Sequence, residues 1–231
     1  MADSCNMLIV IPARGGSKRL PRKNLLPLAG KPLICRSIET ALAARLNARI
    51  VVTSDDDETL ALAGEYESQG VRAHKRPSEL ATDTASTSAA LIDALEAEQK
   101  EGYAPDTLVL LQPTSPLRNA SDILAAIKIF KETGCSDTVV TVCKVDHPSA
   151  WVGVIGDHSR FNGVDLSGKR SQDYQKEYRL NGAVYVIHAE MLMSTRSLFT
   201  ERLRASVMPR IRSFDIDEDF DFRVCESLIS D

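Results

Sequence analysis

The feature that most constrains the fold is the alternation of short, β-branched apolar runs with longer segments of helical spacing. The run at 7–11, MLIVI, is typical of a buried strand, and the segment 32–46 has helical spacing with Pro32 at its start. Further strands are predicted within 49–58, 71–75, 106–118 (a strand with its loop) and 137–144, and further helices at 58–70, 88–100 and 120–134. This order predicts βαβ units. The predicted fold class is therefore α/β, with a mostly parallel mixed sheet and helices on both faces.

The alternation stops between Val145 and Leu180, where Gly, Ser, Asp and Arg are frequent and only AWVGVI, 150–155, looks strand-like. A structureless loop of this length is unusual in a compact domain, so we predict an inserted arm or dimer-forming extension at 145–180. Order returns with NGAVYVIHAE at 181–190, and an acidic segment within 213–229 runs into a terminal helix. The chain of 231 residues is predicted to form one domain, 1–231, with this insertion.

Composition excludes several classes of protein. No apolar run approaches the length that spans a bilayer, and the N-terminus lacks the basic and apolar regions of a signal peptide. The cysteines are Cys5, Cys35, Cys135, Cys143 and Cys225. Their wide spacing, without a CxxC pair, indicates reduced thiols. A net charge of −4 with one basic cluster argues against a nucleic-acid surface. We expect a cytoplasmic protein that binds neither membrane nor nucleic acid.

That basic cluster, IPARGGSKRLPRKN at 11–24, follows the first predicted strand and contains no acidic residue. Loops after the strands of an open α/β sheet are favoured ligand sites. Glycines let backbone N–H groups approach an anion, and Arg and Lys neutralise its charge. The loop matches neither the Walker A motif nor the dinucleotide motif GxGxxG. It predicts a site for several phosphates, with a solvated basic turn as the alternative.

These residues resemble the N-terminal signature of the CMP-sialic acid synthetase family, the acylneuraminate cytidylyltransferases, which include CMP-legionaminate synthetases. The resemblance continues in order through RPSELATDTAST, LLQPTSPLR, YRLNGAVY and SFDIDEDFDF, and so covers nearly the whole chain. It implies a Rossmann-like nucleotidyltransferase fold with an inserted dimerisation extension, and a homodimer. It also implies a reaction in which CMP passes from CTP to the anomeric hydroxyl of a nine-carbon 2-keto sugar acid and pyrophosphate leaves.

The resemblance assigns roles to residues of the basic loop and of RPSELATDTAST. The residues that would bind CTP are Arg14, Ser17, Lys18, Lys23, Asn24, Arg76, Ala85 and Thr87. Arg14 and Lys18 would also be catalytic, because the displacement depends on neutralising the phosphates, and Lys23 would support the leaving group. Asp83 and Thr84 have a structural interpretation instead, as caps of the next helix.

The segment SFDIDEDFDF carries the metal prediction. Asp215 and Asp217 are two residues apart, so on an extended segment both carboxylates point to one face. Two carboxylates with phosphate oxygens make a hard-oxygen site that suits Mg²⁺. By resemblance Asp217 would also be catalytic. The alternative is that these acids only favour the N-terminus of the last helix through its dipole.

The resemblance assigns the residues that would bind the sugar acid less completely than those that would bind CTP. Gln112 matches the family's sugar-contacting glutamine, and Asn181 lies in the matching motif YRLNGAVY. Arg170 is the first choice for the sugar carboxylate and Arg179 the second, because a guanidinium can clamp a carboxylate with two hydrogen bonds. At Tyr174 and the residue after it this chain departs from the Leu-Pro pair that is common in the family. Both N-acetylneuraminate and legionaminate therefore remain open as substrates.

Three rival functions follow from related patterns. Enzymes that activate the eight-carbon acid Kdo share IPAR but usually have a shorter basic stretch, without the Lys-Asn pair. Enzymes that activate pseudaminic acid share the first loop but usually differ at the motif NGAVY. A non-catalytic nucleotide-binding subunit would be expected to lack a phosphate-binding cation or a metal carboxylate, and Arg14, Lys18, Asp215 and Asp217 are all present.

Overall fold

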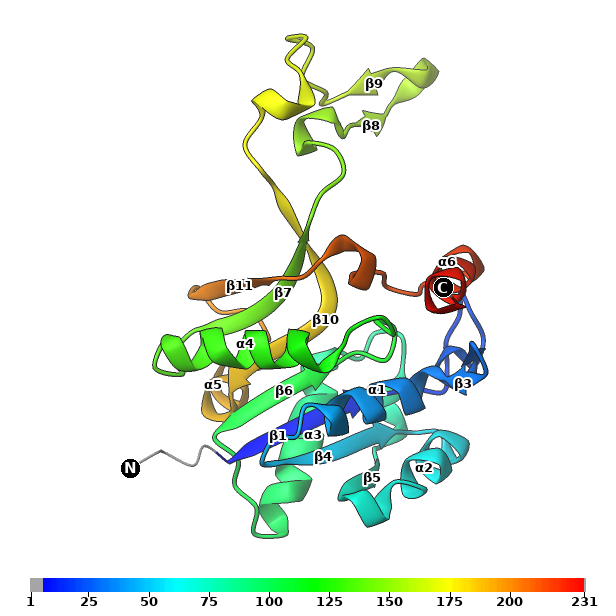
Figure 1. The fold of residues 1–231 in the computed structure, drawn as a ribbon, viewed down its shortest axis with the longest axis vertical. Helices are drawn as coiled ribbons and strands as arrows, with labels where there is room; N and C mark the ends of the chain where they lie inside the picture. The colour runs from blue at the N-terminus through cyan, green and yellow to red at the C-terminus, as the bar shows by residue number, and fades with distance from the viewer. Residues whose placement is uncertain (1–5, 231) are drawn as a thin grey trace.

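The computed structural model of the protein describes residues 6–230 and has a central sheet of seven strands (Figure 1). Its strands are β1 Met7–Pro12, β4 Ala48–Ser54, β5 Val71–Lys75, β6 Thr107–Leu111, β7 Thr138–Lys144, β10 Tyr178–His188 and β11 Leu203–Val207. They lie in the order β11-β7-β10-β6-β1-β4-β5. β10 is antiparallel to β6 and β7, and the other neighbouring pairs are parallel. The predicted mostly parallel mixed sheet is confirmed.

Helices cover both faces of the sheet, as predicted. The α-helices are α1 Leu33–Ala43, α2 Asp57–Gly64, α3 Thr87–Lys100, α4 Ala120–Glu132, α5 Ala189–Thr195 and α6 Asp219–Ser230. Met7, Ile9 and Ile11 of β1 pack in one apolar cluster with α1, α2 and α4. Leu8 and Val10 point to the other face and pack with α3 and α5. The period of two along the strand thus gives both faces a core, and each fully buried side chain contributes roughly 1.5–3 kcal/mol.

The helix starts are set by local side-chain caps. Asn119 and Asp122 form a reciprocal capping box at the start of α4. The interpretation of Asp83 and Thr84 as helix caps is wrong, because α3 is capped by Ser86, whose hydroxyl accepts from the N–H of Ala89. Asp83 is thereby left to interact elsewhere.

Several short regular elements lie where the sequence pattern gave no prediction. α5 is a short helix directly after β10, and β11 is an edge strand that pairs in parallel with β7. β2 Pro27–Leu28 and β3 Lys31–Pro32 form a small antiparallel pair. Single 3-10 turns occur at Lys23–Leu25, Glu67–Gln69, Ser78–Ala81, Ser149–Trp151, Asp157–Ser159, Ser171–Asp173 and Arg210–Arg212. Of the helices that the structure describes, none has the length and apolar character needed to cross a membrane.

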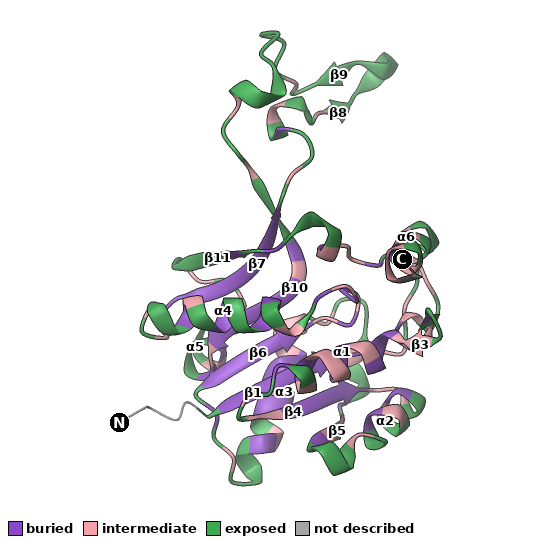
Figure 2. Ribbon diagram, viewed as in Figure 1, coloured by how far each residue is buried: buried purple, intermediate pink, exposed green. Residues whose placement is uncertain are grey.

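Residues 145–177 form an arm that β7 and β10 carry away from the sheet (Figure 1). Its only strands among the described residues are β8 Val154–Ile155 and β9 Phe161–Asn162, which pair antiparallel. Most of the arm is exposed, in contrast to the buried strands of the sheet (Figure 2). The predicted insertion at 145–180 therefore coincides with a structural arm, and its role in dimerisation stays a prediction.

Candidate active site

Residues that follow β1, β5 and β6 line a cleft of about 300 Å³. In an open α/β sheet, ligands collect beyond the carboxyl ends of the strands. Among the residues predicted to bind substrates, those lining this cleft are Arg14, Ser17, Lys23, Asn24, Arg76, Ala85, Thr87 and Gln112. Three segments far apart in the sequence therefore meet in one place.

The basic loop is held against the end of β4 by Asp55. The N–H of Gly15 donates to Asp55 Oδ1 at 3.0 Å, while Asp56 caps α2 by accepting from the N–H of Thr59. A Cβ on Gly15 would lie 2.9 Å from the Cβ of Asp56, closer than ordinary packing permits. Position 15 thus requires glycine because the loop lies directly on the start of α2.

Two predicted phosphate-binding cations share one carboxylate. Arg14 Nη1 lies 3.1 Å from Asp83 Oδ1, and Lys18 Nζ lies 2.6 Å from Asp83 Oδ2. The hydrogen bond from Lys18, with the charge of Arg14 beside it, holds the pKa of Asp83 below its usual range. Asp83 therefore occupies an anion-binding position of the basic loop.

Two buried polar residues, Asn24 and Arg76, line the cleft. Asn24 is buried and donates through Nδ2 to the carbonyl of Arg14 at 3.0 Å, which fixes the loop backbone. Arg76 is buried, with a guanidinium nitrogen 3.7 Å from Asp55 Oδ1, and burial lowers its pKa. Within the described residues its Nε has no hydrogen-bond partner. Arg76 thus lines the cleft with part of its hydrogen-bonding capacity unused.

The basic loop is also bound to the acidic segment before α6. Lys23, whose side chain is only 11% exposed, donates to the carbonyl of Ile216 and lies 3.2 Å from Asp217 Oδ1. Arg19 Nη1 approaches the other oxygen of Asp217, at 2.9 Å. Asp217 therefore links the basic loop to the predicted metal segment.

Of the two predicted metal ligands, Asp215 has the environment that better fits a bound cation. Burial raises its pKa, and its Oδ1 is buried without a hydrogen-bond partner among the described residues. Such an orphaned carboxylate oxygen fits a hard cation. No cluster of three or more His, Cys, Asp or Glu that could hold a metal occurs in 6–230, so a cation here would need further ligands from outside the chain.

The side chain of Gln112 lies on the backbone of β10. A Cβ on Gly182 would be 2.6 Å from Gln112 Oε1 and 3.9 Å from Asp215 Oδ2. Gly182 also has φ of +74°, which disfavours other residues. Gln112, predicted to bind the sugar, and Asp215, predicted to bind the metal, therefore both lie close to Gly182.

Asn181 has a different environment from Gln112. It is buried, and its Nδ2 donates to Ser213 Oγ at 2.9 Å and contacts Met208 Sδ at 3.3 Å. Its Oδ1 accepts from the N–H of Ala183 at 3.2 Å. All of these contacts are with residues of the chain itself, so the side chain of Asn181 stabilises the local conformation of β10. Its contact with the sugar stays a prediction.

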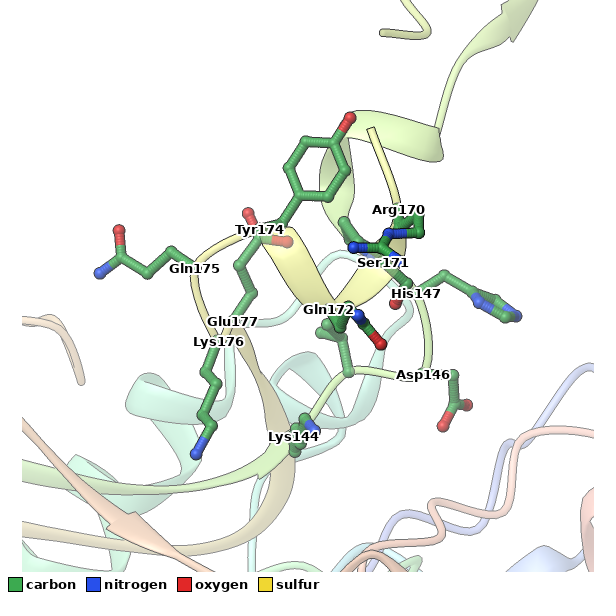
Figure 3. A pocket seen from close by; sticks show the side chains of 12 residues that line it. Lys144, Asp146, His147, Arg170, Ser171, Gln172, Tyr174, Gln175, Lys176 and Glu177 are labelled. Carbon is green, nitrogen blue, oxygen red and sulfur yellow. The ribbon is translucent and has the colours of Figure 1, made fainter. Parts of the chain in front are cut away.

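The two candidate carboxylate-binding arginines are not among the residues that line the cleft. Arg179 is exposed near the start of β10. Arg170 lines a separate cavity of about 550 Å³ at the base of the arm, where its Nε lies 3.3 Å from Asp173 Oδ2 (Figure 3). Lys144 and Lys176 line the same cavity. The cleft therefore contains the predicted glutamine without either predicted arginine.

Comparison with known proteins decides the family. The sequence model described as cytidylyltransferase matches residues 8–205, which includes the basic loop, the segment 76–87 and Gln112. The chain belongs to the cytidylyltransferase family. The motif resemblance to acylneuraminate and legionaminate enzymes is confirmed at this level.

Curated relatives of this cytidylyltransferase act on different sugar acids, to judge from their names. CMP-N,N'-diacetyllegionaminic acid synthase of Legionella pneumophila is 35% identical, over 96% of this chain and 96% of its own length. N-acylneuraminate cytidylyltransferase of Escherichia coli is 34% identical over 94% of this chain, and the match spans about half of its length, 51%. Pseudaminic acid cytidylyltransferase of Campylobacter jejuni is 33% identical, over 93% of each chain.

Solved structures share the fold of this cytidylyltransferase. A CMP:2-keto-3-deoxy-manno-octonic acid synthetase in complex with CTP aligns with a TM-score of 0.71 and 19% identity, over 97% of this chain and 98% of that one. A 4-diphosphocytidyl-2C-methyl-D-erythritol synthase from Anaerococcus prevotii aligns with a TM-score of 0.67 and 12% identity, covering 99% and 98% of the two chains. The nucleotidyltransferase fold is thereby confirmed.

Sequence reasoning missed two acidic residues of this cytidylyltransferase site. Asp55 bonds the basic loop and faces Arg76, and Asp83 pairs with Arg14 and Lys18. The position of Asp55 directly after a strand was a usable signal, because strand ends meet at one edge of a parallel sheet. The pairing of Asp83 had no such signal, since it depends on how the segment 76–87 folds over the loop.

Proposed function

We propose that the protein transfers CMP from CTP to the anomeric hydroxyl of a nine-carbon 2-keto sugar acid of the N-acetylneuraminate or legionaminate type. The hydroxyl oxygen attacks the α-phosphorus, its proton passes to solvent, the bond from that phosphorus to the oxygen bridging the β-phosphate breaks, and pyrophosphate leaves. One observation carries the proposal: a single cleft joins a cationic loop, a buried Arg76 with an unpartnered donor, and Gln112. These correspond to sites for a triphosphate, a base and a sugar.

On the nucleotide side, Arg14 and Lys18 bind the phosphates in place of Asp83. Their present partner is an exposed carboxylate, which a more highly charged triphosphate can displace. Displacement by in-line attack depends on charge neutralisation and positioning, which this loop supplies. Arg76 and Asn24 then hold the cytidine, with Ala85 and Thr87 of the facing segment around it.

On the sugar side, Gln112 binds the acceptor beside Asp215. Support for a nine-carbon acid comes from the printed names of relatives that match most of this chain, the Legionella legionaminic acid enzyme above all. Arg170 remains our first choice for the sugar carboxylate. Arg170 lies in the arm cavity and Gln112 in the cleft. The two residues can therefore bind the same sugar only if the arm of one subunit reaches the cleft of the other.

A divalent cation fits the residues around Asp215. Its orphaned buried oxygen and the carboxylate of Asp217 would hold Mg²⁺ together with phosphate oxygens of the nucleotide. When bound, the ion would neutralise phosphate charge and orient the triphosphate. Lys23 and Arg19 keep Asp217 in position for this role through their ion pairs.

The arm is the proposed homodimer contact. Val152, Val154, Ile155, Phe161 and Leu166 are each more than half exposed, at 66%, 69%, 79%, 58% and 91%. Apolar side chains gathered on one projecting segment are typical of an interaction surface. We further propose a cytoplasmic location for the dimer, because its reaction consumes CTP.

The test is pyrophosphate release from CTP and Mg²⁺ with four acids offered separately: N-acetylneuraminate, diacetyllegionaminate, pseudaminate and Kdo. We expect release with N-acetylneuraminate or diacetyllegionaminate, and its loss in Asp217→Ala. Release with pseudaminate or Kdo alone would overturn the substrate assignment. Binding of CTP without release from any of the four would overturn the enzymatic proposal in favour of a nucleotide-binding protein.

A further inference from the structure

The antiparallel ladder between β6 and β10 stops just before the cleft. Its last pair on that side is Leu111 with Val184. On its other edge, the pairing of β10 with β7 shifts register between Leu180 and Tyr185, around Gly182. The carbonyls of the next two residues along these strands, Gln112 and Ala183, both accept hydrogen bonds from one side chain.

That side chain is Arg118, which is almost fully buried. Its Nη1 donates to the carbonyl of Gln112 at 3.0 Å and to the carbonyl of Ala183 at 2.8 Å. Its Nη2 donates to Ser37 Oγ of α1 at 3.0 Å. The guanidinium thus continues the link between the two strands where backbone pairing has ended.

Stability alone does not account for an arginine at this position. Burial lowers the pKa of Arg118 to about 10, so the group still carries its charge near neutral pH at a desolvation cost. Its Nε is buried and has no partner among the described residues, which adds an unsatisfied donor. A neutral side chain would avoid both penalties. What the arginine adds is a planar fork that fixes several acceptors at once.

Gln112 is the cleft residue that this fork controls. Arg118 and the N–H of Ser115, at 3.2 Å, both hold its carbonyl, while its side-chain amide lies against Gly182. The same guanidinium group holds Ala183, the neighbour of Gly182. Arg118 therefore fixes the backbone under Gln112 and the surface on which its amide lies.

We propose that Arg118 is a positioning residue for the sugar acid, acting through Gln112; the inference rests on the proposed function for its kinetic consequence. Arg118 is not among the residues that line the cleft, so it acts without touching either substrate. Small displacements of a binding group have large kinetic effects. Loss of the fork therefore weakens sugar binding selectively and leaves the CTP side, built on the basic loop and Arg76, intact.

The test compares Arg118→Lys, which keeps a charge but loses the fork, with Arg118→Gln, which keeps one NH₂ donor without the charge. Each is expected to raise KM for the sugar acid roughly tenfold or more while KM for CTP stays within about twofold. The matched control is Ser37→Ala, which removes the third partner of Arg118 and is expected to lower the melting temperature with little effect on either KM.

A double-mutant cycle separates positioning from general destabilisation. In a Gln112→Ala background, Arg118→Lys should cause no further rise in sugar KM, because the two changes disrupt one interaction. The side-chain amide resonance of Gln112, assigned in NMR spectra by its loss in Gln112→Ala, should move in Arg118→Lys and stay in Ser37→Ala. Equal changes in both KM values, additive effects in the cycle, or an unmoved resonance overturn the inference.

The resonance also keeps the two proposals distinguishable. If the wild-type protein releases no pyrophosphate with any acid but the Gln112 resonance moves in Arg118→Lys, the proposed function falls and the control of Gln112 by Arg118 stands. If the wild-type protein turns over and neither Arg118 variant changes the Gln112 resonance or the sugar KM, the proposed function stands and the control of Gln112 by Arg118 falls.

Discussion

The ammonium of Lys18 lies 2.6 Å from the carboxylate of Asp83, 65 residues away along the chain, and Arg14 shares that carboxylate. Both cations belong to the loop that we propose binds the triphosphate. The segment 76–87 therefore supplies its own anion to the phosphate site when no nucleotide is bound. On the proposed function, opening this contact is part of CTP binding.

Removal of the competing charge should strengthen CTP binding. In Asp83→Asn the cations Arg14 and Lys18 no longer need to leave a carboxylate, so we expect Kd for CTP to fall roughly two- to fivefold at low ionic strength, the scale of exposed ion pairs. The gain should shrink in high salt. Titration calorimetry at two salt concentrations measures both effects.

Glu58→Gln is the matched control, because Glu58 pairs with Arg22 of the same loop without touching Arg14 or Lys18. It should leave the Kd nearly unchanged. Weaker binding in Asp83→Asn would mean that Asp83 orients the cations for CTP instead of competing with it.

The metal proposal predicts different behaviour for neighbouring aspartates. Asp215→Asn and Asp217→Asn should each lower turnover roughly 10²–10³-fold, the scale seen when one preorganised electrostatic group is lost. Their Mg²⁺ titrations should saturate at higher concentrations. Asp219→Asn is the control, because Asp219 lies in the first turn of α6 and pairs with Arg223. Wild-type activity in the presence of EDTA would contradict the metal assignment.

The arm proposal predicts a change of assembly without loss of the fold. Ile155→Glu combined with Phe161→Glu places charges on the exposed strands β8 and β9, and we expect the mass measured by light scattering to fall from dimer to monomer. The charge disfavours burial of this apolar surface in an interface. Leu124→Glu, at a partly exposed apolar position of α4, should leave the mass unchanged. A monomeric wild-type protein at assay concentration would refute the proposal.

Cys225 should be unreactive in the native protein. Burial raises the pKa of its thiol to about 12, so almost no thiolate is present at pH 8. Because folding favours the protonated thiol, this contribution to stability is present below the ordinary thiol pKa and is lost as pH rises toward 12. Iodoacetamide labelling followed by peptide mass spectrometry should modify Cys225 slowly at pH 8 and rapidly in denaturant. Rapid labelling of the native protein would show that α6 opens readily.

The sheet and the basic loop were predictable because they depend on local patterns. Short continuous apolar runs, as at Met7 to Ile11, favour strands that are buried on both faces of a sheet. The motif residues Arg14, Asn24, Arg76 and Gln112 were identified individually. Their meeting in one cleft follows from the rule that parallel strands end at a common edge.

The sequence by itself determined the α/β class and the position of the arm, because periodicity and its interruption encode them, and motif resemblance supplied half of the residues that line the cleft. Only the tertiary structure decided that Asp83 pairs with Lys18, that Asn181 points inward, and that Arg118 lies beneath Gln112. Asp83 and Lys18 are 65 residues apart, and Asn181 reaches Ser213 32 residues away, while Arg118 joins Gln112 to Ala183 of β10 and to Ser37 of α1. Between the pairs Leu180–Val142 and Tyr185–Val140, β10 advances five residues while β7 advances two, and no local sequence pattern predicts this irregularity.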